Sequence, residues 1–211
     1  MHLVESYATN CGLKIDKPHI FEKFFPLGFE KYITFETSTD PAKDYDYWHD
    51  VISVIQPELQ EEGITIIQLG KSGSKQVQGC ATAIGITNRN QEAYIIKNSL
   101  LHFGVDGYLS QLAGIYNKNT VCLYSNNNKN DIKPYWGDPE KQILIESDRD
   151  GKKPSFSSNE NPKTINMIKP EVISEAISKL LNLKHDFNYK TLEFGFNYSN
   201  KIVESVPNQI V

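Results

Sequence analysis

Several features that would assign this 211-residue chain to a particular class of protein are missing. Lys and Arg number 22 against 26 Asp and Glu, a net charge of −4, so the chain lacks the basic excess of a protein that binds nucleic-acid phosphates. No apolar run approaches the ~20 residues of a membrane-spanning helix. The first residues carry neither the basic segment nor the apolar core of a secretory signal. We therefore predict a cytoplasmic protein without a nucleic-acid partner.

Cysteine is scarce as well. Cys11, Cys80 and Cys122 are far apart and none belongs to a CxxC pair, which favours free thiols in a reducing compartment over a disulfide framework or a zinc site. The histidines are isolated, and His102, inside an expected buried strand, is more typical of a core residue than of a catalyst. We expect neither a metal nor a cofactor.

What the chain does contain is a repeated alternation of strand and helix signals. The expected strands span residues 31–37, 64–69, 100–105, 120–125 and 142–146, and the expected helices cover 3–11, 47–59, 88–96, 108–116 and 170–183. Pro57 should kink or end the second helix early. Strands that alternate with helices in this way predict parallel βαβ units. The expected fold class is α/β, a Rossmann-like, doubly wound parallel sheet, with a small C-terminal hairpin formed by residues 191–196 and 201–206.

Candidate ligand-binding residues follow from this fold, because ligands of open parallel sheets bind at the carboxyl ends of the strands. The turn Asp106-Gly107-Tyr108 leads from a strand directly into a helix, whose free N–H groups suit a phosphate. The alternative is that Asp106 is simply the N-cap of that helix. Lys43, which we expect to be an exposed loop residue, follows the first strand and could neutralise a diphosphate. The glycine-rich residues 70–74 match neither a Walker A loop nor GxGxxG.

The order of these segments resembles a known family. Gly104-Val105-Asp106-Gly107, then Leu109-Ser110-Gln111-Leu112-Ala113, then Val121-Cys122-Leu123-Tyr124 are similar to the C-terminal domain of glycosyltransferase family 9, the heptosyltransferase-like enzymes of GT-B architecture. Lys43 followed by Trp48 resembles the start of the family's first helix in that domain. Ile168-Lys169-Pro170-Glu171 resembles its closing helix. The resemblance extends over about residues 31–183.

The chain departs from the family pattern at several positions. Gly107 stands where the family has Ser or Thr, Tyr108 where it has Gly, and Gln111 where it has His. The Glu expected shortly after the second strand is missing, and Lys75 and Gln76 lie near its place. These departures indicate a donor site that is degenerate or differently specific.

The resemblance implies a division of the chain into three parts. Residues 1–30 would be a helix and connection from an N-terminal domain that is missing here, residues 31–185 the Rossmann-like domain that binds a nucleotide sugar, and residues 186–211 an extension that starts a further segment. The acceptor site and the catalytic base of such enzymes lie mostly on the N-terminal domain. No catalytic residue is therefore assigned, and the isolated chain is expected to be inactive.

By the same resemblance, the function is donor binding in a glycosyltransferase of cell-surface glycan synthesis, with hexosyl or heptosyl transfer in the full-length protein. The donor, a nucleoside-diphosphate sugar, would be bound by Lys43, Asp106, Gly107, Tyr108 and Gln111 without an obligatory metal. The acceptor would be a glycan or a lipid-linked glycan, which would allow peripheral association with a membrane. Two alternatives stay open: a catalytically inactive GT-B-like nucleotide-binding or interaction module, and a different enzyme, such as an epimerase, on the same half-fold.

Overall fold

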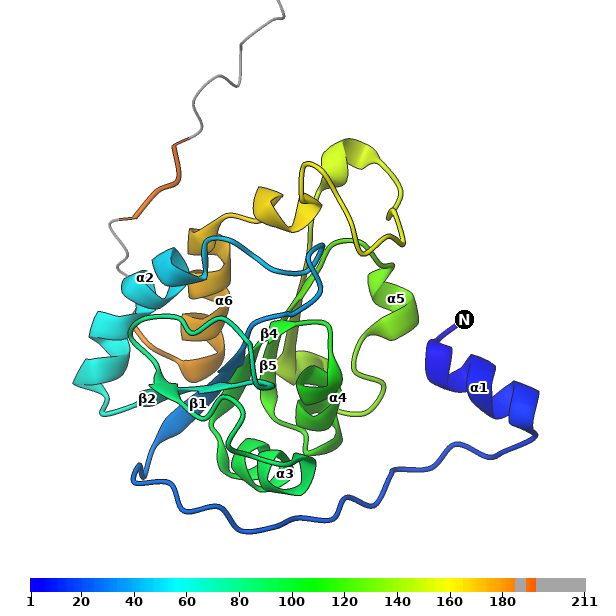
Figure 1. The fold of residues 1–211 in the computed structure, drawn as a ribbon, viewed down its shortest axis with the longest axis horizontal. Helices are drawn as coiled ribbons and strands as arrows, with labels where there is room; N and C mark the ends of the chain where they lie inside the picture. Colours follow the sequence, from blue (N-terminus) through cyan, green and yellow to red (C-terminus); the bar gives the residue numbers. More distant parts are fainter. Residues whose placement is uncertain (185–188, 193–211) are drawn as a thin grey trace, which may run out of the picture.

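A single parallel sheet forms the centre of the computed structural model of the chain, which describes residues 1–184 and 189–192 (Figure 1). Its six strands run in the order β3-β2-β1-β4-β5-β6 and all neighbouring pairs are parallel. The strands are β1 (Tyr32–Glu36), β2 (Thr65–Leu69), β3 (Ala81–Thr82), β4 (Leu101–Val105), β5 (Asn119–Tyr124) and β6 (Gln142–Glu146). This is the strand order of dinucleotide-binding folds, and it confirms the predicted fold class. Only β3 was not predicted, because two residues are too few to form a pattern.

Helices cover both faces of this sheet. The helices of the described residues are α1 (Leu3–Cys11), α2 (Trp48–Glu61), α3 (Arg89–Asn98), α4 (Tyr108–Ile115), α5 (Lys129–Ile132) and α6 (Pro170–Leu181), with short 3₁₀ turns at Pro139–Lys141, Arg149–Gly151 and Thr164–Met167. Helices α2 and α6 pack together on one face, and α3 and α4 pack on the other. The sheet is therefore doubly wound.

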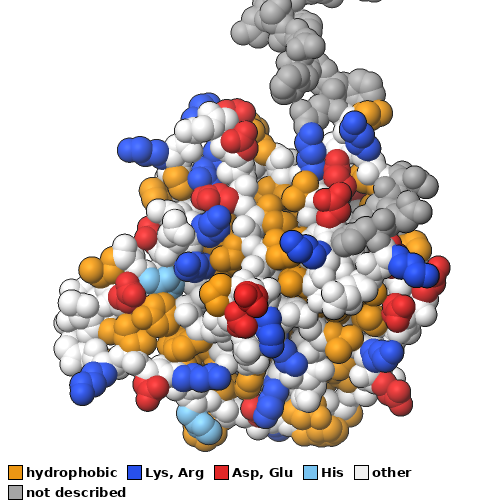
Figure 2. All heavy atoms as spheres, turned by 180° about the vertical axis from the view of Figure 1, so that it is seen from behind, with side chains coloured by type: hydrophobic (Ala, Val, Ile, Leu, Met, Phe, Trp, Pro, Cys, Tyr) orange, Lys and Arg blue, Asp and Glu red, His pale blue; other side chains and the backbone are white. Residues whose placement is uncertain are grey.

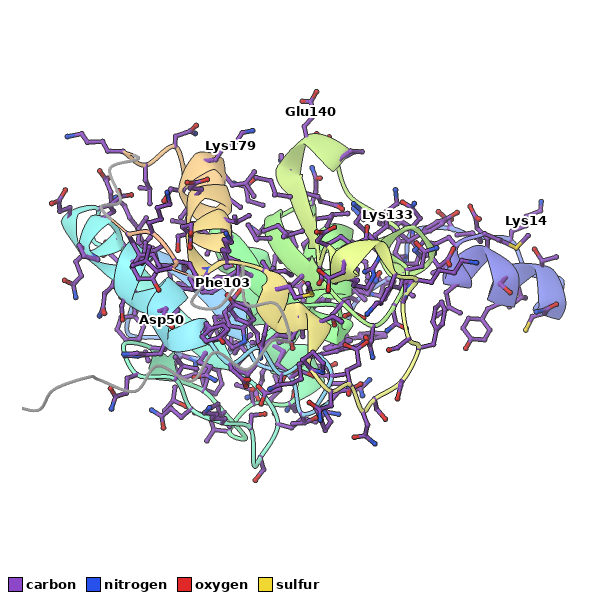
Figure 3. All side chains as sticks on the ribbon, turned by 90° about the horizontal axis from the view of Figure 1, so that it is seen from above. Lys14, Asp50, Phe103, Lys133, Glu140 and Lys179 are labelled. Atoms are coloured by element: carbon purple, nitrogen blue, oxygen red, sulfur yellow. The ribbon has the colours of Figure 1, made fainter. Side chains whose placement is uncertain are left out.

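Side chains alternate between the two faces along β1. Ile33 and Phe35 belong to the core beneath α2 and α6, where Phe35 stacks on Phe103 of β4 with ring centroids 4.7 Å apart. Figure 3 shows Phe103 in the interior. Tyr32 belongs to the opposite core beneath α3 and α4. Because the strand period is two residues, Thr34 and Glu36 lie on the same face as Tyr32.

Two local predictions can be checked against the helix ends. The expected early end of the helix at Pro57 is wrong, since α2 continues through it to Glu61. Its fully buried face, which includes Ile55 and Leu59, keeps the helix packed although Pro57 donates no backbone hydrogen bond. The expected start of α3 is confirmed: the Asn88 side chain accepts from the backbone N–H of Gln91 at 3.0 Å, and the Gln91 side chain accepts in return from the N–H of Asn88.

The N-terminal helix stands apart from the rest of the molecule in Figure 1, and an extended stretch connects it to β1. Helix α1 has no buried residue and ends at Gly12, whose φ of +65° is left-handed. His2 fixes its start by a hydrogen bond of 2.8 Å between its Nε2 atom and the carbonyl oxygen of Lys133. In the other direction, the predicted hairpin at 191–196 and 201–206 lies outside the described residues except for 191 and 192.

Charges of both signs are dispersed over the surface. On the described part of the face drawn in Figure 2, Lys and Arg side chains are interspersed with Asp and Glu rather than gathered in one field. Lys14, Glu140 and Lys179 project outward at separate places in Figure 3. Among the described residues, no helix is long and apolar enough to cross a membrane.

Candidate ligand-binding site

A cavity of about 550 Å³ lies at the point where the strand order reverses, between β1 and β4. Its walls come from the residues that follow β1, β2 and β4 and from the first turn of α3. The carboxyl ends of strands at such a switch point are where open α/β sheets bind ligands. A larger hollow of about 980 Å³ lies near the end of β6 and the start of α6, away from this point. The β1/β4 cavity is therefore the candidate site.

The turn after β4 forms one wall of this cavity. Asp106, Gly107 and Tyr108 all line it, as the sequence analysis expected of a strand that leads directly into a helix. Gly107 is the N-cap of α4, and no side chain within the described part of the chain caps the helix. The alternative that Asp106 is the N-cap is therefore wrong. The first backbone N–H groups of α4, which have no partner inside the helix, are available to a ligand at this wall.

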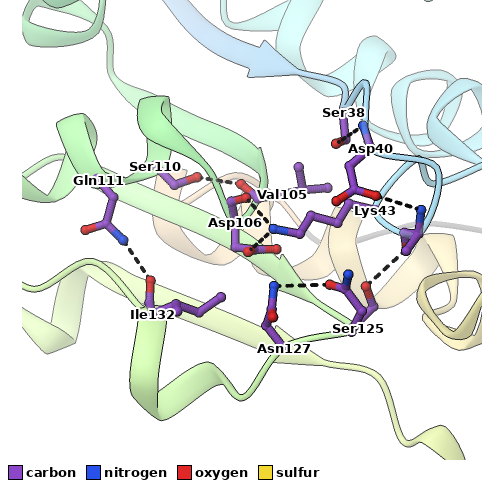
Figure 4. A network of polar contacts seen from close by, with 12 residues as sticks. Ser38, Asp40, Lys43, Val105, Asp106, Ser110, Gln111, Ser125, Asn127 and Ile132 are labelled. Atoms are coloured by element: carbon purple, nitrogen blue, oxygen red, sulfur yellow. Dashed lines mark hydrogen bonds and ion pairs between the residues drawn. The ribbon is translucent and has the colours of Figure 1, made fainter. Parts of the chain in front are cut away.

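Lys43 reaches the same turn but is not exposed as expected. Its Nζ atom lies 2.5 Å from Oδ2 of Asp106 and 3.5 Å from the Asp106 carbonyl oxygen (Figure 4). The two side chains are only 16% and 7% exposed. The expectation of a solvated loop lysine fails because the loop after β1 folds back over the end of β4. As a result, the positive charge of Lys43 is already paired with a carboxylate.

Burial and pairing act in opposite directions on Asp106. Burial, the larger influence, raises the pKa of its carboxyl above the ordinary value, while the Lys43 ammonium and hydrogen bonds lower it. Asp106 therefore takes up a proton more readily than a free aspartate does. A proton there would release Lys43 from its partner.

The loop that carries Lys43 is held at several points. The Asp40 carboxylate accepts from the backbone N–H of Ala42 at 3.1 Å, and the Ser38 hydroxyl accepts from the N–H of Asp40 at 2.9 Å. The Ser125 hydroxyl, at the end of β5, donates to the carbonyl of Ala42 at 3.2 Å. Figure 4 shows these contacts on both sides of Lys43. The lysine is thus placed by local turns and by a neighbouring strand.

Gln111 is not brought to the cavity. Its Nε2 atom donates to the carbonyl of Ile132 at 2.7 Å, and its Oε1 atom accepts from the backbone N–H of Tyr135 at 3.4 Å. The side chain therefore attaches α4 to the loop after α5, and Gln111 does not belong to the cavity wall.

Tyr108 contacts Arg89 of α3 at the mouth of the cavity. Its ring lies beneath the guanidinium of Arg89, 5.0 Å from the ring centroid, and its hydroxyl donates to the Arg89 carbonyl at 3.4 Å. The side chain is 40% exposed. A flat ring and a guanidinium plane at the entrance could stack on a planar group of a ligand.

The structure adds a carboxylate that the sequence analysis did not select. Glu36, the last residue of β1, lines the cavity, and its Oε1 atom is buried without a hydrogen-bond partner in the described residues. The ring of His102 lies beside it, with its Nε2 atom 3.7 Å from that oxygen and itself buried without a hydrogen-bond partner in the described residues. The other ring nitrogen of His102, Nδ1, lies within hydrogen-bond distance of the Thr34 hydroxyl oxygen, at 3.1 Å. The expectation that His102 lies in the core is confirmed.

A second carboxylate, that of Glu92 in the first turn of α3, also lines the cavity. Burial is the main cause that raises its pKa, and the charge of Glu36 adds to the effect. Lys71, after β2, and Arg89 supply positive charge to the same cavity. The site therefore holds acidic groups at its floor and cations at its edge. The described residues contain no group of three or more His, Cys, Asp or Glu placed to hold a metal ion.

No protein-family model and no curated protein matches the chain in sequence. Solved structures do match it in fold. A glycosyltransferase family 9 protein from Veillonella parvula superposes over 84% of this chain and 50% of its own, with 17% identity and a TM-score of 0.58. The E. coli ADP-heptose lipopolysaccharide heptosyltransferase II matches over 84% and 51% of the two chains, with 18% identity and a TM-score of 0.53.

The E. coli heptosyltransferase WaaC, solved with ADP, matches over 83% of this chain and 54% of its own, with 14% identity and a TM-score of 0.54. The chain thus spans about half the length of the structures it matches. This chain has the heptosyltransferase-like fold of glycosyltransferase family 9. At these identities, the match establishes the fold and not the activity.

Proposed function

We propose that this chain is the donor-binding part of a glycosyltransferase and that the β1/β4 cavity binds a nucleoside-diphosphate sugar. The observation that carries the proposal is the position of this cavity at the switch point of a 3-2-1-4-5-6 sheet, with the N-terminus of α4, which no side chain of the described residues caps, in its wall. Backbone N–H groups at a helix start bind phosphate through both hydrogen bonds and the helix dipole. The fold neighbours support the assignment, since two of them are named heptosyltransferases and one was solved with ADP.

In this proposal, the phosphates lie against the turn at Gly107 and Tyr108, and cations at the cavity edge offset their charge. Lys71 and Arg89 are placed to do this. Lys43 joins them when Asp106 is protonated or turns away, because its ammonium is otherwise held by that carboxylate. The charge neutralisation that a metal provides in other enzymes would come from these groups.

The experiment is a thermal-shift screen of the purified chain against ADP, UDP, GDP, CDP and their sugar conjugates, followed by calorimetric titration of any ligand that stabilises it. A ligand at ~100 times its dissociation constant should add about 2.7 kcal/mol to the free energy of unfolding. If none of these ligands stabilises the chain at millimolar concentration, the proposal is wrong.

A matched pair of variants tests the location. Gly107→Val places a side chain at the start of α4, where even a Cβ would lie 3.3 Å from Oε1 of Glu36 and would narrow the approach to the helix N-terminus. Its φ of −169° is an extended value that valine adopts. Gly28→Val is the control, because a Cβ at Gly28 meets nothing within 4 Å. Only the first variant should weaken nucleotide binding.

Two contacts favour the inactive alternative, a nucleotide-binding or interaction module. The pairing of Lys43 with Asp106 and the attachment of Gln111 to the α5 loop remove two expected donor contacts from the cavity. Neither the main proposal nor this alternative predicts sugar transfer by this chain alone. Turnover by the isolated chain with a glycan acceptor would contradict both.

A further inference from the structure

The carboxylate of Glu36 is placed as a ligand-binding group rather than as a structural one. In the described residues, its buried Oε1 atom accepts no hydrogen bond, and it faces His102 at 3.7 Å, which is beyond hydrogen-bond distance. A buried carboxylate oxygen that accepts no hydrogen bond is costly, since that atom has lost water and gained no donor. The 14% of the side chain that stays exposed belongs to the wall of the cavity.

The surrounding backbone leaves room for this side chain. A Cβ on Gly104, on the neighbouring strand β4, would lie 2.8 Å from Cγ of Glu36 and 2.9 Å from its backbone oxygen. A Cβ on Gly107 would lie 3.3 Å from its Oε1 atom. Two glycines therefore border Glu36, so the carboxylate reaches the start of α4 where a larger neighbour would exclude it.

The chemistry of the carboxylate decides what it can accept. Ionised, it is an acceptor only and needs a donor from the ligand. A phosphate at neutral pH is an anion and supplies no donor, so phosphates bound at the start of α4 must keep their oxygens away from the Glu36 carboxylate, which lies beside Gly107. Hydroxyl groups supply donors, and an acidic residue at the carboxyl end of a strand reads ribose hydroxyls in other dinucleotide-binding sheets.

We propose that Glu36 is the specificity residue of this cavity and accepts hydrogen bonds from a hydroxyl pair of the ligand, either on the ribose or on the transferred sugar. This rests on the proposed function, because it assumes a nucleotide-sugar ligand. His102 is the positioning residue: its ring, fixed by Thr34 from behind, lies next to Oε1 and limits where the carboxylate can go.

Calorimetric titration with matched ligands and variants tests this. The probes are the best-bound nucleoside diphosphate of the screen, its 2′-deoxy counterpart and its hexose conjugate. Glu36→Met removes the acceptor at similar length, and Glu36→Gln keeps one amide oxygen. Glu140→Gln is the control, because it removes a negative charge from an exposed residue that does not line the cavity.

If Glu36 reads the ribose, wild type binds the ribonucleotide about ten- to hundredfold more tightly than the 2′-deoxy form, and Glu36→Met abolishes that ratio. If it reads the sugar, the loss of affinity in Glu36→Met appears only with the hexose conjugate. In either case Glu36→Gln is intermediate and Glu140→Gln keeps the affinity ratio.

The same ratios of affinity between the matched probes test the role of His102. His102→Gln, which keeps a polar group beside the carboxylate, should retain part of the discrimination, and His102→Leu should lose it. A purely structural histidine would change all affinities together and leave the ratios unchanged.

Two results are decisive against the proposal. In the first, wild type binds nucleotide but Glu36→Met binds every probe as tightly as wild type does, or more tightly. Glu36 is then only an anion at the helix start, and this inference is wrong while the proposed function stands. If wild type binds none of the probes, the proposed function fails and the inference with it.

Discussion

Removal of Lys43 should destabilise the fold, because it leaves Asp106 buried without its partner. The two charges are 2.5 Å apart with side chains 16% and 7% exposed. At that separation the gross attraction is about 6–7 kcal/mol for an effective dielectric constant of ~20. Desolvation of both ions offsets most of it, so the pair contributes little net stability, but loss of one partner costs about 3–5 kcal/mol. We expect Lys43→Met to lower the free energy of unfolding by about 3 kcal/mol at pH 7.

The pH dependence of this cost follows from the pKa of Asp106, which burial already raises and which rises further without Lys43. A carboxyl with a raised pKa in the folded chain binds its proton more tightly there than in the unfolded chain. Its protonation therefore favours folding at low pH, and this contribution is lost as pH rises through the folded pKa. The deficit of Lys43→Met should shrink between pH 7 and pH 5.

Urea unfolding followed by circular dichroism at both pH values measures these quantities. The double variant Lys43→Met with Asp106→Asn is the control, since it removes both charges and should lie within about 1 kcal/mol of wild type. The reasoning is refuted if the free energy of unfolding of Lys43→Met lies within about 0.5 kcal/mol of the wild-type value at pH 7 and this difference is the same at pH 5.

Three further outcomes can be measured. Nucleoside-diphosphate affinity in titration calorimetry should rise as pH falls through the raised pKa of Asp106, and Asp106→Asn should show the higher affinity already at pH 7; an Asp106→Asn profile identical to wild type contradicts this. Gly104→Ala should cost about 1–3 kcal/mol in urea unfolding, because its Cβ would lie 2.9 Å from a backbone oxygen of β1, whereas Gly28→Ala should be neutral. Asn88→Ala should lose about 1 kcal/mol in thermal melts with its helix cap, and an unchanged melt would show that the cap is dispensable.

The framework of the fold could be predicted because its signals are local. Strands buried on both faces read as short apolar runs, and the caps at Asn88 and Gly12 mark helix ends. The position of Asp106 at a carboxyl end of the sheet followed from the direct succession of strand and helix. The early helix end predicted at Pro57 was wrong because tertiary packing along α2 outweighed the local tendency of proline to end a helix.

The details of the site were less accessible because they depend on contacts across the chain. Lys43 and Asp106 are 63 residues apart, and their pairing needs β1 and β4 to be neighbours. Glu36 ends an apolar strand, where an acidic residue is ordinary at a surface. Its contact with His102 follows only from the register that places Thr34 opposite His102. A polar residue on every second position of β1 was the one sequence signal available.

The most direct test of the central claim is where a nucleotide binds. In ¹H–¹⁵N NMR spectra titrated with the nucleoside diphosphate that stabilises the chain most, our account predicts the largest amide shifts at Gly107 and Tyr108, with smaller ones at Arg89 and Lys71. These residues all line the β1/β4 cavity. Shifts concentrated at the hollow beside β6, with Gly107 and Tyr108 unchanged, would contradict it.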